Sequence, residues 1–313
     1  MKFEFHRIRF QFRSGATLYF PPGKAGNTAR GAFGGILRKL ACLPGCLGAK
    51  TCAARATCPY ARVFEPQAAP GEGPSGLTNR PRPFVFRASH LDGRTIREGE
   101  PFYFDVHLFD VHDSALPHFV QAFSQLGQEG LGPARGRAEL IAVDQLDLQG
   151  LKVALPNAID LAVNPGVDPF VNPFVNPGDA PRRERLRLRF VTPTELKSAG
   201  QVDDRPEFGI LFARLRDRIS TLRALYGAGP LEIDFRAMGA RAAAIQMSQC
   251  HLTHKAAERL SSRTGQRHSL GGFVGEAEYE GDLGGFVSYL RLGKWVGVGR
   301  QTVWGKGEIE VIE

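Results

Sequence analysis

The 313-residue sequence predicts an α+β protein in which one order of elements, β-α-β-β-α-β, occurs twice. Each half begins with a strand whose alternate residues are arginines and continues with a helix that has apolar residues at helical spacing. Each half also ends with a glycine-rich loop followed by a closing strand. The predicted domains cover residues 1–150 and 182–313, and residues 151–181 join them.

The first half starts with a strand in which Arg7, Arg9 and Arg13 alternate with apolar residues. A helix capped by Asn27 or Thr28 is expected next, because GNTARGAFGGILRKLAC places its apolar side chains on one face. PFVFRA and PFYFDVHLF then have the composition of strands. A second helix is expected from Asp113 or Ser114, and GLGPARG leads into the closing strand RAELIAV.

The second half repeats this order. Its first strand carries Arg183, Arg185, Arg187 and Arg189 on one face, and apolar residues at helical spacing follow over 208–222. LEIDFRAM and GGFVGEAEYEG are predicted as strands, a helix is expected from Asp282, and GVGRQTVWGKG precedes the last strand, EIEVI. The order is that of the ferredoxin-like (RRM-like) motif, so the predicted fold is two ferredoxin-like domains in tandem.

The segment between the halves contains VNPG, VDPF, VNPF and VNPG in succession at residues 163–178. A proline in every repeat prevents a continuous helix and central pairing in a sheet. We therefore expect an extended linker or a surface loop at 151–181.

The charge of the chain favours a polyanionic partner. There are 40 Lys and Arg against 32 Asp and Glu, a net charge of +8, and each predicted domain carries +5. Arginine supplies 31 of the 40 cations, which suits phosphate recognition but is equally consistent with a GC-rich genome. The N-terminus lacks the apolar segment of a signal peptide and no long apolar run follows, so the sequence predicts a cytoplasmic protein without a membrane partner.

The glycine loop, residues 297–307, places Gly297-x-Gly299 and Gly305-x-Gly307 before the last strand. Amides of such glycines can approach a phosphate closely, with Arg300 and Lys306 supplying charge. The spacing is neither a Walker loop nor the dinucleotide fingerprint, which disfavours nucleotide-dependent chemistry. The alternative is structural: the glycines allow a tight loop against the sheet.

Four cysteines, Cys42, Cys46, Cys52 and Cys58, lie within 17 residues of a predicted insertion at about 42–66. We interpret them as a tetrahedral structural zinc site, with free or disulfide-linked thiols as the alternatives. Four cysteine ligands would leave no open position on the metal, so no catalytic cofactor is expected from this site.

Five stretches in this order resemble the RAMP-superfamily endoribonucleases that cut precursor CRISPR RNA within its repeats. They are FPPGKAGNTARGAFGGILRKLAC, CPYARVFEP, RFVTPTELK, RLSSRTGQRHSLGGFVGEAEYEGDL and GVGRQTVWGKGEIEV. The resemblance implies repeat RNA and guide RNA as partners, within a CRISPR effector complex, and one cut without a metal ion. It implies attack by the 2′-hydroxyl, which leaves a 2′,3′-cyclic phosphate and a 5′-hydroxyl.

Two other hypotheses stay open. One is a non-catalytic RAMP subunit that binds guide RNA in an interference complex, and the other is a ferredoxin-like RNA-binding protein unrelated to CRISPR. The glycine loop and the arginine strands suit all three. Only the first two explain the five stretches.

The resemblance assigns candidate residues. Family members often carry His, sometimes with Tyr, on or near the first helix; this chain has neither there, and Lys24 and Arg30 are the candidates. His254 and His268, in or beside the basic stretch 236–267, are further catalytic candidates if that stretch is a hairpin that grips RNA; the alternative is solvated histidines. The residues expected to bind RNA are Gly297, Gly299, Arg300, Gly305, Lys306, Gly307, Arg259, Arg263, Arg267, Arg185 and Arg187.

Overall fold

A computed structural model describes residues 3–43, 45–46, 48–49, 51–67, 80–111, 115–132, 134–153, 183–198, 200–260 and 267–312. The chain divides into two compact units. The N-terminal unit consists mainly of Glu4–Asp168, and the C-terminal unit mainly of Pro169–Arg223 and Ala228–Glu313. The repeats at 163–178 and most of the expected linker lie outside the described residues.

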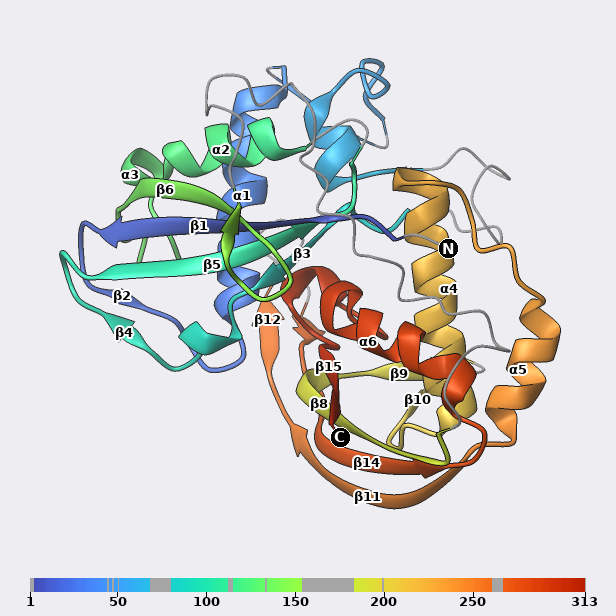
Figure 1. Ribbon diagram of the computed structural model, residues 1–313. Helices are drawn as coiled ribbons and strands as arrows, with labels where there is room; N and C mark the ends of the chain where they lie inside the picture. Colours follow the sequence, from blue (N-terminus) through green and yellow to red (C-terminus); the bar gives the residue numbers. More distant parts are fainter. Residues whose placement is uncertain are drawn as a thin grey trace. The chain divides into compact units, whose positions relative to one another are not determined.

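The N-terminal unit is built on an antiparallel sheet with the strand order β3-β5-β1-β6-β7 (Figure 1). Its elements are β1 (His6–Ser14), β2 (Leu18–Tyr19), α1 (Ala25–Ala41), a π-helical turn η1 (Tyr60–Phe64), β3 (Phe84–Arg87), the 3₁₀ turn η3 (Ser89–Leu91), β4 (Thr95–Ile96), β5 (Pro101–Leu108), α2 (Leu116–Ser124), α3 (Leu126–Glu129), β6 (Ala138–Leu146) and β7 (Lys152–Val153).

The C-terminal unit has a four-stranded antiparallel sheet with the order β11-β14-β8-β15. Its elements are β8 (Arg185–Thr194), β9 (Leu196–Ser198), β10 (Gln201–Asp203), α4 (Phe208–Tyr226), α5 (Phe235–Ala243), β11 (Gln246–Lys255), β12 (Glu258–Leu260), β13 (Arg267–Ser269), β14 (Gly272–Glu280), the 3₁₀ turn η4 (Gly284–Phe286), α6 (Val287–Val296), the 3₁₀ turn η5 (Thr302–Trp304) and β15 (Ile309–Ile312).

The two sheets confirm the predicted fold class. In each, the first strand of the motif lies between the third and the fourth, and the second strand is next to the third: β3-β5-β1-β6 in one unit and β11-β14-β8-β15 in the other. This is the strand order that the β-α-β-β-α-β connection produces in a ferredoxin-like domain. None of the described helices combines the length and the apolar character that crossing a membrane requires.

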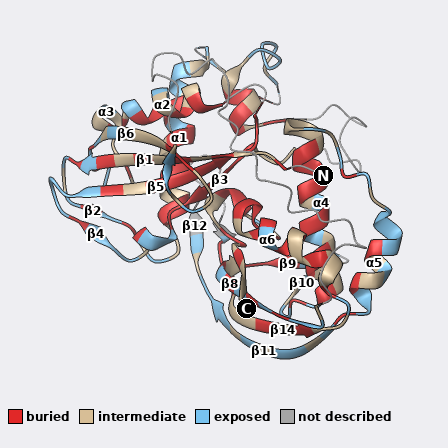
Figure 2. Ribbon diagram, in the orientation of Figure 1, coloured by how far each residue is buried: buried red, intermediate tan, exposed pale blue. Residues whose placement is uncertain are grey.

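Phenylalanines form the centre of the N-terminal core. Alternate β1 residues, among them Phe10 and Phe12, are buried on the face that α1 and α2 cover. Phe33 of α1 stacks on Phe119 of α2, with ring centroids 3.8 Å apart. Figure 2 shows buried residues on these two helices and along the strands beneath them. The other face of β1 carries its polar residues, which makes that face available for a site.

The beginnings of the helices in the N-terminal unit differ from the sequence prediction. Helix α1 begins at Ala25 with Lys24 at its N-cap, earlier than the predicted caps Asn27 and Thr28. The amide of Ala25 donates to Asp92 Oδ1 at 2.8 Å, so a residue remote in sequence caps this helix. Helix α2 begins at Leu116, and the caps predicted for it lie outside the described residues.

Two segments of the C-terminal unit also differ. LEIDFRAM, predicted as a strand, leads into helix α5, where Asp234 accepts a hydrogen bond from the Ala237 amide. The strand that takes its place is β11, an edge strand with mostly exposed residues and no apolar alternation. Helix α6 begins at Val287, after the turn η4, and not at Asp282.

Two glycines of α1 are expected to respond oppositely to alanine. A Cβ on Gly34 would lie 2.0 Å from Cζ of Phe64, whose buried ring cannot retreat, whereas a Cβ on Gly35 would meet nothing within 4 Å. Gly34→Ala should therefore lower the free energy of unfolding by about 1–3 kcal/mol. Gly35→Ala should raise it by about 0.5–1 kcal/mol, because it improves helix propensity alone. Urea denaturation of both variants measures the difference, and equal effects would contradict the packing described here.

Candidate nucleic-acid interface

The glycine loop connects α6 to β15, and the amides of three of its four glycines donate hydrogen bonds within the protein. The amide of Gly297 donates to Gly293 O at 2.9 Å, that of Gly305 to Thr302 O at 2.9 Å and that of Gly307 to Pro193 O at 3.1 Å. A Cβ on Gly299 would lie 2.3 Å from Glu195 O. The amides of these three glycines are therefore engaged, and the loop packs against the chain before β9; contact between the loop and a phosphate stays a prediction.

The two cations of the glycine loop have different surroundings. The Arg300 side chain is 50% exposed and forms an ion pair with Glu195, and its amide donates to Glu195 O at 3.0 Å. Lys306 is buried at 5% exposure. Arg300 is therefore the charged side chain of this loop that is accessible to a phosphate, and the expected contact by Lys306 does not fit its burial.

The arginines of β8 pair with glutamates of β14. Arg185 lies 3.1 Å from Glu280, and Arg187 lies 3.2 Å from Glu278. Arg189 is 2.9 Å from Glu276. Each exposed pair stabilises the sheet by only about 0.2–1 kcal/mol. The three pairs nevertheless cancel in charge, so the expected cationic ladder of Arg185 and Arg187 is a neutral ladder of cross-strand ion pairs.

Only part of the basic stretch 236–267 lies in paired strands, because its beginning belongs to helix α5 and residues 261–266 lie outside the described residues. Strands β12 and β13 pair antiparallel and continue the paired strands β11 and β14. The amide of Leu270 donates to Ala257 O at 2.6 Å where the two strand pairs meet. Arg259 and His268 are register partners there. Arg267 pairs with Leu260, His254 is exposed on β11, and Arg263 lies outside the described residues. The structure thus brings Arg259, Arg267 and His268 onto one hairpin.

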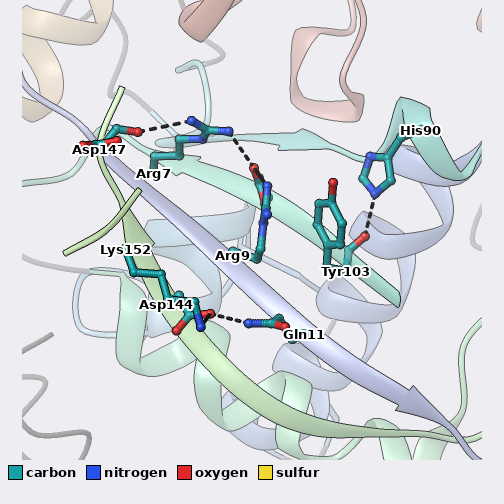
Figure 3. A network of polar contacts seen from close by, with 9 residues as sticks. Arg7, Arg9, Gln11, His90, Tyr103, Asp144, Asp147 and Lys152 are labelled. Carbon is teal, nitrogen blue, oxygen red and sulfur yellow. Dashed lines mark hydrogen bonds and ion pairs between the residues drawn. The ribbon is translucent and has the colours of Figure 1, made fainter. Parts of the chain in front are cut away.

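The face of the N-terminal sheet opposite α1 and α2 carries a largely half-buried polar network on β1, β5 and β6 (Figure 3). Arg9 binds Asp105 through two N–H···O contacts, of 2.7 and 3.0 Å, and Arg7 reaches the same carboxylate at 3.3 Å. The hydrogen bond to Asp105 raises the pKa of Arg9. Two guanidinium groups share one carboxylate, so this group of three keeps a net charge of +1, unlike the β8 ladder.

His90, which is not among the residues predicted from the sequence, lies at the same face. Its Nε2 is 2.9 Å from Tyr103 O, and its ring stacks on the Tyr103 ring with centroids 4.4 Å apart. The Arg9 guanidinium lies 3.8 Å from the centroid of the same ring, and Figure 3 shows Tyr103 between Arg9 and His90. Nothing in the segment ASHLDG signals these contacts, because each partner comes from β1 or β5.

The catalytic candidates near α1 separate by burial. Lys24 is half-buried at the N-cap. Arg30 is 7% exposed, and its guanidinium lies 4.3 Å from the centroid of the Phe64 ring. Arg30 thus packs in the core, which disfavours direct contact with RNA, and its catalytic role stays a prediction. Both lie in the N-terminal unit, whereas the other predicted catalytic residues and the predicted RNA-binding residues lie in the C-terminal unit.

The four clustered cysteines are unpaired and half-buried. The Cys42 thiol hydrogen-bonds with Cys46, and burial with this contact raises the pKa of Cys42 to about 11. A backbone hydrogen bond from Gly48 and the thiol of Cys52 lower the pKa of Cys46. Within the described residues, no three His, Cys, Asp or Glu side chains are arranged to hold a metal ion. The zinc site therefore stays a prediction.

Metal analysis tests the zinc prediction. We expect the purified protein to contain about one zinc per chain, because four thiolates satisfy tetrahedral Zn²⁺. Replacing all four cysteines with serine should remove the metal and lower the melting temperature of the insertion. Cys250→Ser is the matched control and should keep the metal. Protein purified without chelator that contains no zinc would contradict the prediction.

Residues 188–309 match the family of CRISPR-associated endoribonuclease Cas6, and residues 3–163 match a family named AF_1859_N, described as an N-terminal domain. No curated protein matches the chain in sequence.

Among solved structures, the Thermus thermophilus Cas6 (TTHB231) is similar in fold. Its product complex is 15% identical with a TM-score of 0.56, over 99% of each chain. The product complex of Cas6 (TTHA0078) is 17% identical with a TM-score of 0.53, also over 99% of each chain. At such identities the likeness establishes the fold alone.

Proposed function

We propose that this chain, which belongs to the CRISPR-associated endoribonuclease Cas6 family, cuts precursor CRISPR RNA within its repeats by attack of a 2′-hydroxyl on the adjacent phosphate. The bond between phosphorus and the 5′-oxygen breaks. The products are a 2′,3′-cyclic phosphate and a 5′-hydroxyl. No water molecule acts as nucleophile, so the reaction needs no metal-activated hydroxide.

One observation carries this proposal: the family match over residues 188–309. That range contains the β12–β13 hairpin and the glycine loop, including Arg259, Arg267 and Arg300. The two similar structures named above are product complexes, which supports an RNA partner for this fold. The net charge of +8 agrees with such a partner, since cationic proteins bind RNA partly through counterion release. We expect repeat RNA, the guide RNA cut from it and a CRISPR effector complex as partners.

The chemistry requires three contributions from the protein. A base accepts the proton of the 2′-hydroxyl, an acid gives a proton to the leaving 5′-oxygen, and cations stabilise the pentavalent phosphorane. Lys24 is suited to the second and third roles, because its ammonium carries both a proton and a charge at the start of α1. His254 and His268 on or near the hairpin stay candidates for contact with the scissile phosphate.

One experiment separates cleavage from binding. The protein is incubated in EDTA with repeat RNA from the CRISPR array of its own genome, and in parallel with the same RNA carrying one 2′-deoxynucleotide at the scissile position. We expect cleavage of the first RNA only, with a cyclic phosphate on the upstream fragment. Tight binding of both RNAs without a cut would reject the nuclease and favour a non-catalytic RNA-binding subunit.

A further inference from the structure

The imidazole of His90 is held in one tautomer with its second nitrogen available. A carbonyl oxygen can only accept a hydrogen bond, so the 2.9 Å contact with Tyr103 O requires Nε2 to carry the proton. Nδ1 then has a lone pair when the ring is neutral. The residue is exposed, while the stack on Tyr103 fixes the plane of the ring. A general base needs this combination of fixed orientation, accessible lone pair and defined tautomer.

The charges around His90 favour its neutral form. Burial of part of the ring lowers its pKa, and Arg9 and Arg94 lower it further. The hydrogen bond to Tyr103 O and the charge of Asp105 act in the opposite direction without reversing the shift. The lowered pKa of His90 favours the neutral ring, which is the form able to accept a proton.

The same surroundings supply positive charge for a phosphate. Arg7, Arg9 and Asp105 together keep a net charge of +1, and Arg94 is exposed. The segment that contains His90 is bound to the start of α1 by one hydrogen bond, in which the Ala25 amide donates to Asp92 Oδ1 at 2.8 Å. Lys24 is the residue before Ala25, and His90 is two residues before Asp92. The side chain suited to be a base and the one suited to be an acid thus come from two segments joined by one hydrogen bond.

We infer that His90 is the general base of the RNA-cleaving site, located on the face of the N-terminal sheet that carries Arg9 and Tyr103. Nδ1 takes the proton of the attacking 2′-hydroxyl as the bond between the 2′-oxygen and phosphorus forms. The bond between phosphorus and the 5′-oxygen breaks, and the Lys24 ammonium protonates the leaving oxygen. Arg9 and Tyr103 are positioning residues that hold the ring. The inference rests on the proposed function and names the residue that performs its first proton transfer.

The test compares His90→Ala with the matched control His118→Ala, a half-buried histidine of α2. Cleavage of repeat RNA is measured in a single turnover with saturating protein, and affinity is measured separately with the 2′-deoxy RNA. We expect His90→Ala to cut at least about 100-fold more slowly, as loss of a general base does. Its affinity for the 2′-deoxy RNA should stay within about threefold of wild type, and His118→Ala should keep the wild-type rate constant.

Two further measurements distinguish a base from a structural residue. Added imidazole should restore part of the activity of His90→Ala. The wild-type rate should rise with pH as His90 loses its proton, and this rise should be absent in His90→Ala. A rate constant within about threefold of wild type overturns the inference, and so does a slow variant that imidazole does not rescue. If His90→Ala is slow only because its affinity falls in parallel, the inference is likewise overturned. Wild-type protein that binds without cutting overturns the proposed function itself, which is a different result.

Discussion

Asp105→Asn is expected to lower the free energy of unfolding of the N-terminal unit by about 3–5 kcal/mol, as removal of one partner from a buried ion pair does. The Asp105 side chain is 8% exposed and accepts three hydrogen bonds from Arg7 and Arg9. Asparagine keeps the shape but not the charge, so two partly buried guanidinium groups would share no anion on β5. Urea denaturation followed by circular dichroism measures the loss.

The β8 ladder provides the control. Glu276→Gln removes the same kind of partner from Arg189, but both side chains are far more exposed, at 33% and 51%. We expect a loss below about 1 kcal/mol there, because solvent already screens the pair. Equal losses at the two sites would contradict the argument that burial, and not the contact itself, sets the cost. Since Arg9 also contacts the Tyr103 ring, Asp105→Asn should in addition slow RNA cleavage by loosening His90.

Local patterns were sufficient to predict the fold. The alternation in β1 and β8 and the helical spacing in α1 and α4 gave the correct element types, and their order gave both sheets. The strand predicted at residues 231–238 was wrong because LEIDF alternates like a strand. Asp234 as an N-cap and the spacing of Phe235, Met238 and Ala242 instead indicate a helix. Strand β11 was missed for the opposite reason: it lies at an edge, where nothing requires apolar alternation.

The site was less predictable because its properties depend on partners from other strands. From the sequence alone, Arg187 on an alternating strand looks suited to contact RNA, but in the structure it pairs with Glu278. The alternating glutamates of GEAEYE were the sequence signal for these ion pairs. His90 has no local signal at all: Tyr103 and Arg9 define its tautomer and plane from two other strands. Arg30 shows the reverse case, in which a charged residue near the predicted site is in the core.

Gly307→Ala is expected to lower the free energy of unfolding of the C-terminal unit by at least about 3 kcal/mol. Two costs combine. The backbone φ of Gly307 is +71°, a left-handed conformation that costs a residue with a Cβ about 1 kcal/mol. In addition, the new Cβ would lie 1.9 Å from Val298 O and 2.9 Å from Val298 N, which are backbone atoms and cannot rotate away. The Val298 amide donates to Gly307 O at 2.8 Å, so the clash also strains that hydrogen bond.

Gly229→Ala separates the two costs, because Gly229 has a φ of +92° but no atom within 4 Å of the added Cβ. It should lose only about 1 kcal/mol, the conformational cost alone. Thermal unfolding of both variants beside wild type gives the comparison. If Gly307→Ala is as stable as Gly229→Ala while its affinity for repeat RNA falls, the glycine serves phosphate contact after all. If Gly307→Ala is less stable than Gly229→Ala and its folded fraction binds RNA with wild-type affinity, the glycine loop serves packing. Arg300 and the β12–β13 hairpin would then supply the basic contacts of this unit.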